Sequence, residues 1–197
     1  MLKVGVAGLR RGWGLLHTFH NHRDAQVVAV CDQEAELRQK ASDEFGIKAG
    51  YADFAKMLAA DLDAIVVATP APLHAGQSIA AMEAGAHVLS EGPAAWTLDE
   101  CAALAATVRR TGRTYMMAEN MNYFHYLQVW KERIKAGEIG DVFYAEAEYI
   151  HDCRTLMRDA AGELQLEDVD LPQLSYELTR AGLETHELGL YTEPDSL

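Results

Sequence analysis

The sequence predicts an α/β fold, in which a doubly wound parallel sheet is followed by an incomplete α+β second domain. Segments with the apolar pattern of strands alternate with helical segments over the first 120 residues. Residues 63–69 contain a continuous apolar run, which is typical of a strand covered on both faces. Glycine and polar residues follow the strands at their carboxyl ends, where such a sheet binds its ligands.

The first element is a buried strand at residues 4–7, which runs into a glycine-rich turn and then a helix. The N–H groups at the start of a helix can hold a pyrophosphate. Counting from Gly8, the G-x-G-x-x-G pattern of dinucleotide-binding turns requires glycine where this chain has Arg10 and Trp13. Gly12 and Gly14 supply permissive backbone one residue out of step.

Two arginines in the same turn offer a second means of holding phosphate. A guanidinium donates paired hydrogen bonds to phosphate oxygens, so Arg10 or Arg11 could contact the pyrophosphate directly. The alternative is an ordinary strand-turn-helix whose arginines are solvated.

An acid ends the second predicted strand, at residues 26–31. Asp32 comes 20 residues after Gly12, the separation at which a carboxylate reaches the adenosine ribose. A carboxylate accepts hydrogen bonds from a free 2′-hydroxyl and repels a 2′-phosphate. The sequence therefore predicts NAD as the cofactor and disfavours NADP.

The remaining elements complete a first domain predicted at residues 1–121. Gly46 and Gly85 each end a helix, and Thr97 with Glu100 forms a capping box that starts another. In chain order we expect a helix at 34–45, an extended piece at 47–51, a short helix at 52–60, a strand at 63–69, a helix from after Pro72 to 84, a strand at 87–90, a helix at 97–110 and a strand at 114–118.

Residues 122–197 are expected to form a partial C-terminal domain for substrate binding and oligomerisation. An aromatic helix is predicted at 122–135, and residues 141–151 alternate like a half-exposed strand. One strand cannot form a stable sheet alone, and its open edge must be paired or covered. We therefore expect a homo-oligomer.

Composition narrows the class of protein. A formal net charge of −13 argues against nucleic acid or an anionic membrane as a partner, and 49% hydrophobic with 24% charged residues is typical of a soluble globular protein. The three scattered cysteines are expected to be reduced thiols of a cytoplasmic protein. A strand that begins at the second or third residue leads us to expect no signal peptide, and no apolar run is long enough to span a membrane.

From residue 3 to about residue 151 the chain resembles the Gfo/Idh/MocA family of nicotinamide-dependent oxidoreductases of sugars, cyclitols and related polyols. The matching segments are the glycine turn, residues 30–32, 68–70 with His74, 83–93, 118–120 and 135–140. The resemblance implies a Rossmann domain whose cofactor is lined by Gly8, Gly12, Asp32, Thr69, Pro70, His74, Glu91, Pro93 and Asn120.

The resemblance also implies where proton transfer should occur. The family often uses a lysine in a Glu-Lys-Pro motif, but this chain has Gly92 between Glu91 and Pro93. His186 resembles the family's second-domain histidine and is our candidate general base, although Gly182 replaces an aspartate often found four residues earlier. A lone helical histidine is, alternatively, a surface or packed residue. Glu91 is expected to help to position the reacting end of the cofactor.

Two further groups have both a functional and a structural interpretation. His17 and His20 share a helical face, but no acid or cysteine completes a ligand set, so no metal site is predicted. Tyr123 is the aromatic residue closest to Asn120 and could face a sugar substrate. Core packing between domains is the alternative.

The sequence is compatible with three functions. The first is an NAD-dependent oxidoreductase acting on a hydroxyl or carbonyl of a sugar, cyclitol or related small molecule. The second is an NAD-binding sensor or assembly subunit without turnover, which the loss of the family lysine favours. The third is a glycoside-cleaving enzyme that cycles a hydride on bound NAD.

Overall fold

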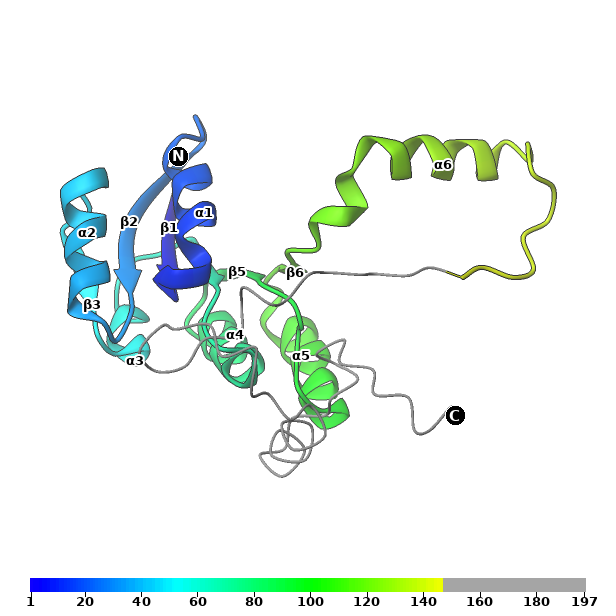
Figure 1. Cartoon of the computed structure of the whole chain (residues 1–197). Helices are drawn as coiled ribbons and strands as arrows, with labels where there is room; N and C mark the ends of the chain where they lie inside the picture. The colour runs from blue at the N-terminus through cyan, green and yellow to red at the C-terminus, as the bar shows by residue number, and fades with distance from the viewer. Residues whose placement is uncertain (147–197) are drawn as a thin grey trace, which may run out of the picture. The chain divides into compact units, whose positions relative to one another are not determined.

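The computed structural model describes residues 1–146, and Figure 1 shows its elements in chain order. The strands are β1 (Leu2–Ala7), β2 (Ala25–Cys31), β3 (Ala49–Tyr51), β4 (Ala64–Val67), β5 (His87–Ser90) and β6 (Tyr115–Met117). The helices are α1 (Leu9–His20), α2 (Ala35–Phe45), α3 (Phe54–Met57), α4 (His74–Glu83), α5 (Leu98–Thr111) and α6 (His125–Lys135), with 3-10 turns η1 (Ala71–Leu73) and η2 (Asn120–Tyr123).

The six strands form one sheet in the order β3-β2-β1-β4-β5-β6, and every neighbouring pair is parallel. The chain winds outward from β1 to β3, crosses back to β4, and winds outward again to β6. This order confirms the predicted doubly wound α/β fold. It also places the topological switch point, where such sheets bind ligands, between β1 and β4.

Two apolar clusters cover the two faces of the sheet. Side chains alternate along each strand, so Val66 of β4 packs with α1 and α2, whereas its neighbours Ile65 and Val67 pack with α3, α4 and α5. From the helices, Leu9 and Leu16 join the first cluster. Burial of both faces explains why the central strands are nearly continuous apolar runs.

The predicted helix ends are also present. Thr97 accepts a hydrogen bond from the N–H of Glu100, whose carboxylate accepts one from the N–H of Thr97, so the capping box is confirmed. Gly46 ends α2 in the left-handed conformation, with φ of 69°. These local signals set where the helices begin and end, and hence where the loops at the carboxyl edge lie.

The described part of the second predicted domain differs from expectation. The helix predicted at 122–135 begins instead as η2 and continues as α6 after a break at Phe124. Residues 141–146 belong to no strand, and the rest of the strand predicted at 141–151 lies outside the described residues. A strand is defined by pairing, and within residues 1–146 this segment has no strand partner.

Contacts within the chain divide it into two units, Met1–Lys135 and Ala136–Leu197. The sequence suggests a domain boundary between residues 121 and 122, which stays a prediction. Within the described residues, no helix combines the length and apolar character needed to cross a membrane.

Candidate functional site

The turn between β1 and α1 presses against the end of β4. Gly8 has φ of +86°, and a Cβ added to it would lie 2.3 Å from the carbonyl oxygen of Ala68 and 2.6 Å from the nitrogen of Thr69. The Gly8 N–H donates to the carbonyl of Cys31 at 2.8 Å. Only glycine suits a residue with this conformation and these neighbours. The turn thereby joins the ends of β1, β2 and β4.

Gly12, one of the two glycines that are out of step with the motif, lets α1 approach the sheet closely. It is buried, and a Cβ there would lie 3.1 Å from Cβ of Ala68 and 3.2 Å from Cγ1 of Val6. Close helix–strand packing is the role of the last glycine in the dinucleotide-binding pattern. By contrast, a Cβ on Gly14 would meet nothing within 4 Å.

The amino terminus of α1 offers backbone donors at the switch point. The first N–H groups of a helix have no acceptor within the helix, and the residue before α1, Gly8, has no side chain to cap them. Asp32 accepts the N–H of Leu9. The following N–H groups, of Arg10 and Arg11, are the donors that this helix end presents to an anion.

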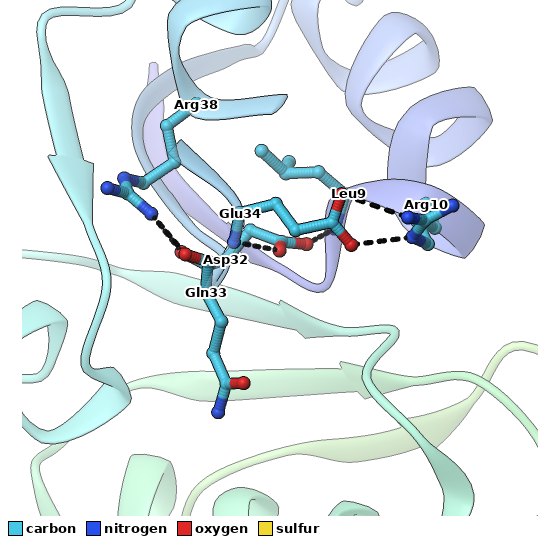
Figure 2. A network of polar contacts seen from close by, with 6 residues as sticks. All are labelled: Leu9, Arg10, Asp32, Gln33, Glu34 and Arg38. Carbon is cyan, nitrogen blue, oxygen red and sulfur yellow. Dashed lines mark hydrogen bonds and ion pairs between the residues drawn. The ribbon is translucent and has the colours of Figure 1, made fainter. Parts of the chain in front are cut away.

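Asp32 is held by two backbone N–H groups, as Figure 2 shows. Its Oδ2 accepts from Leu9 at 2.7 Å, and its Oδ1 accepts from Glu34 at 2.9 Å. Each carboxylate oxygen can accept a second hydrogen bond. The carboxylate is therefore oriented by the chain and retains the capacity to receive ribose hydroxyls.

The two arginines of the turn are paired with acids. The Arg10 guanidinium donates to both carboxylate oxygens of Glu34, from Nε at 2.7 Å and from Nη2 at 2.9 Å (Figure 2). Arg11 donates from Nε to Oε2 of Glu91 at 3.0 Å. Sequence reasoning missed Glu34, because nothing in the spacing of the motif singles out the residue two positions after Asp32.

The loops after β4 and β5 are joined by a buried histidine. The side chain of His74 is 2% exposed, and its ring nitrogens lie 2.7 Å from the carbonyl oxygen of Thr69 and 2.8 Å from that of Pro93. The Thr69 hydroxyl donates to Oε1 of Gln77 at 2.6 Å. His74 thus lies between two main-chain carbonyls and links the loop after β4 to the loop after β5. Pro70 is exposed at the start of η1.

Gly92 occupies the position at which the resembled family often has a lysine, and the space around it is free for a side chain. A Cβ on Gly92 would meet only Sδ of Met117, at 3.9 Å, which is ordinary van der Waals contact. Its neighbour Glu91 has a side chain that is 17% exposed and bonded to Arg11. The structure therefore leaves room for a side chain that this chain lacks.

Asn120 and Tyr123 lie in η2, beyond β6. The preceding Glu119 accepts the N–H of Met121 at 3.1 Å and so caps this turn. Asn120 is exposed, and Tyr123 is 67% exposed. His186, the candidate general base, lies outside the described residues.

Within residues 1–146, no group of three or more His, Cys, Asp and Glu side chains is arranged to hold a metal ion. The histidines of α1 instead pack on an aromatic ring, since the rings of His17 and His20 lie 6.0 and 4.9 Å from that of Phe45. Both histidines are exposed, and their rings contact α2 through Phe45.

Comparison with known proteins gives a family match over most of the first domain. The family described as "Oxidoreductase family, NAD-binding Rossmann fold" (GFO_IDH_MocA) matches residues 2–119. A "Glycosyl hydrolase family 109 protein" of Shewanella amazonensis is 32% identical over 169 residues, which are 80% of this chain and 37% of that protein. The chain thus spans little more than a third of the length of this relative.

Solved structures share the fold. The scyllo-inositol dehydrogenase from Lactobacillus casei with bound cofactor NAD(H) and scyllo-inositol superposes with a TM-score of 0.69, at 23% identity over 72% of this chain and 43% of that one. The WlbA dehydrogenase from Bordetella pertussis in complex with NADH and UDP-GlcNAcA has a TM-score of 0.67, at 28% identity over 71% of this chain and 43% of that one.

Proposed function

Because the chain belongs to the oxidoreductase family with an NAD-binding Rossmann fold, we propose that it is an NAD-dependent oxidoreductase of a hydroxyl or carbonyl group on a sugar, cyclitol or related small molecule. The observation that carries the proposal is the hydrogen bond from Leu9 to Asp32. It brings a ribose-binding carboxylate beside the helix end that binds pyrophosphate, as dinucleotide recognition requires.

Each part of the site has a separate task in this proposal. The N–H groups of Arg10 and Arg11 hold the pyrophosphate, and Asp32 accepts the hydroxyls of the adenosine ribose. The negative charge of Asp32 disfavours a 2′-phosphate, so NAD is preferred to NADP. When bound, NAD supplies the hydride acceptor or, as NADH, the hydride donor.

The reacting end lies toward β5 and β6. Glu91, held by Arg11, and Asn120, which follows β6, are proposed to position the nicotinamide side of the cofactor. Hydroxyl oxidation also requires a base for the hydroxyl proton. Gly92 has no group that transfers a proton, so His186 is the proposed base, and Tyr123 is the proposed contact to the substrate.

A second candidate function is glycoside cleavage in which a hydride cycles on bound NAD without net oxidation. The similarity to a family 109 glycosyl hydrolase over 80% of this chain favours it. Both functions use the same proposed dinucleotide site at the carboxyl ends of the strands, and they differ in the product.

The first experiment is calorimetric titration of the purified chain with NADH, with NADPH as the control. We expect tight binding of NADH and much weaker binding of NADPH. If the chain binds neither NADH nor NADPH, the proposal is wrong. If NADH binds, sugars and cyclitols are tested for NADH formation by its absorbance. Aryl glycosides are tested for release of the aryl group. Cleavage without NADH formation would favour the second function, and binding without either activity would favour an NAD-binding protein without turnover.

A further inference from the structure

The pair formed by Arg10 and Glu34 lies beside the carboxylate that binds ribose in the proposed function. Two of the three guanidinium nitrogens, Nε and Nη2, donate to the two oxygens of one carboxylate, a fork geometry specific to arginine (Figure 2). Glu34 also donates its own N–H to Asp32. One residue therefore touches both the ribose-binding acid and the nearest arginine of the turn.

Arg10 is a cation close to the proposed ribose site at Asp32. Enzymes of this fold accommodate the 2′-phosphate with an arginine close to the end of the second strand. Arg10 follows Leu9, whose N–H is bonded to Asp32, and its side chain is 77% exposed. The Glu34 hydrogen bond and charge, with a smaller contribution from Asp32, raise the pKa of Arg10 above its usual value. Arg10 thus carries a full positive charge near the ribose edge.

The other nearby cation, Arg38, is directed at the main chain. Its Nη1 donates to the carbonyl oxygen of Asp32 at 2.6 Å and to that of Gln33 at 3.0 Å (Figure 2). These bonds hold the loop that carries Asp32 and Glu34. Of the two cations drawn around this loop, Arg10 is the one whose partner is a removable side-chain carboxylate.

We propose that Glu34 is a specificity-determining residue, which excludes NADP by pairing with Arg10 through its Nε and Nη2 donors and by adding a second carboxylate beside Asp32. This inference rests on the proposed function, since it assumes that the ribose lies at Asp32. A 2′-phosphate carries close to two negative charges at neutral pH and needs an unpaired cation. With Glu34 in place, the guanidinium is paired with a carboxylate and the phosphate meets two negative charges, those of Asp32 and Glu34.

The pair contributes little to folding, which makes the proposal testable by substitution. Exposed ion pairs typically contribute about 0–1 kcal/mol to stability, and the side chains of Arg10 and Glu34 are 77% and 46% exposed. The matched control is Glu36→Gln, which removes the same charge from an exposed position in the first turn of α2.

The test measures Kd for NADH and for NADPH by calorimetry on the full chain, in the wild type, Glu34→Gln, Glu36→Gln and the double variant Arg10→Gln/Glu34→Gln. We expect Glu34→Gln to lower the ratio of the NADPH Kd to the NADH Kd by about tenfold, because a freed guanidinium gains a charge-assisted bond to phosphate. Glu36→Gln should keep the wild-type ratio, and the double variant should lose most of the gain.

The outcomes separate this inference from the proposed function. If the wild type binds neither dinucleotide, the proposed function and the inference both fail. If the wild type binds NADH and Glu34→Gln keeps the wild-type ratio, the inference alone fails. A gain that persists in the double variant would also overturn it, because Arg10 would then not be the group that receives the phosphate.

Discussion

The carboxylate of Asp32 accepts the backbone N–H of Leu9 at 2.7 Å, across 23 residues of sequence. The bond joins the end of β2 to the first turn of α1, so the two parts of the proposed dinucleotide site are positioned by each other. Asp32 thereby has a structural role within the chain as well as a proposed role toward ribose.

Substitution of Asp32 should affect both roles. We expect Asp32→Ala to weaken NADH binding by about tenfold or more and to reduce its preference over NADPH, because hydrogen bonds to a charged group contribute about 1.5–3 kcal/mol each. The free energy of unfolding should also fall, since the N–H groups of Leu9 and Glu34 lose their acceptor. Calorimetry and urea denaturation measure the two effects. Asp43→Ala, an exposed acid of α2, serves as the control, and an unchanged cofactor preference in Asp32→Ala would contradict the assignment.

The glycines of the turn should differ sharply in their tolerance of a side chain. Gly8→Ala is expected to lower the free energy of unfolding by more than about 3 kcal/mol, because its Cβ would overlap Ala68 and its φ is positive. Gly14→Ala should raise it by up to about 1 kcal/mol, because alanine favours a helix and the space there is open. Urea denaturation compares the two variants. Equal effects would show that the close approach at Gly8 is absent in solution.

Restoring the family lysine should be structurally permitted. A Cβ at position 92 meets only Sδ of Met117 at 3.9 Å, so we expect Gly92→Lys to fold with nearly wild-type stability. If proton transfer limits turnover, the rate of NADH formation with its best polyol should rise by about a hundredfold. Gly92→Ala is the matched control, since it adds a Cβ without an amine. A folded, NADH-binding Gly92→Lys that is no faster than Gly92→Ala would exclude a proton-transfer role at this position.

Stability should fall at alkaline pH because of one thiol. Burial, with a smaller contribution from the negative charge of Asp32, raises the pKa of Cys31 from 9.0 to about 11. Between these two values the folded state keeps a proton that the unfolded state has lost. The free energy of unfolding should therefore decrease from pH 9 to pH 11, by up to about 1.4 kcal/mol per pH unit.

The measurement is urea denaturation at a series of pH values, compared between the wild type and Cys31→Ala. Other groups titrate in the same range, so the diagnostic quantity is the difference between the two slopes. Cys101→Ala, which removes an exposed thiol, should keep the wild-type slope. Identical slopes in the wild type and Cys31→Ala would contradict the raised pKa.

Many features of the candidate dinucleotide site, at the carboxyl ends of the strands, could be predicted from local sequence signals. Apolar runs and helix caps depend on residues a few positions apart, so they placed the strands, the Thr97 capping box and the glycine turn, and Asp32 followed from its spacing. The strand predicted at 141–151 is different, because strand formation depends on a pairing partner that an alternating pattern does not supply. His186 and the proposed homo-oligomer stay predictions.

By itself, then, the sequence determined the alternating elements and the residues at the strand ends, since periodicity and capping are local properties of the chain. Only the tertiary structure decided what those residues contact. It paired Arg10 with Glu34 across 24 residues and Arg11 with Glu91 across 80, and it buried His74 between two carbonyls. The physical reason is that a long charged side chain has several partners within reach, and the choice depends on which loops the folded sheet brings together.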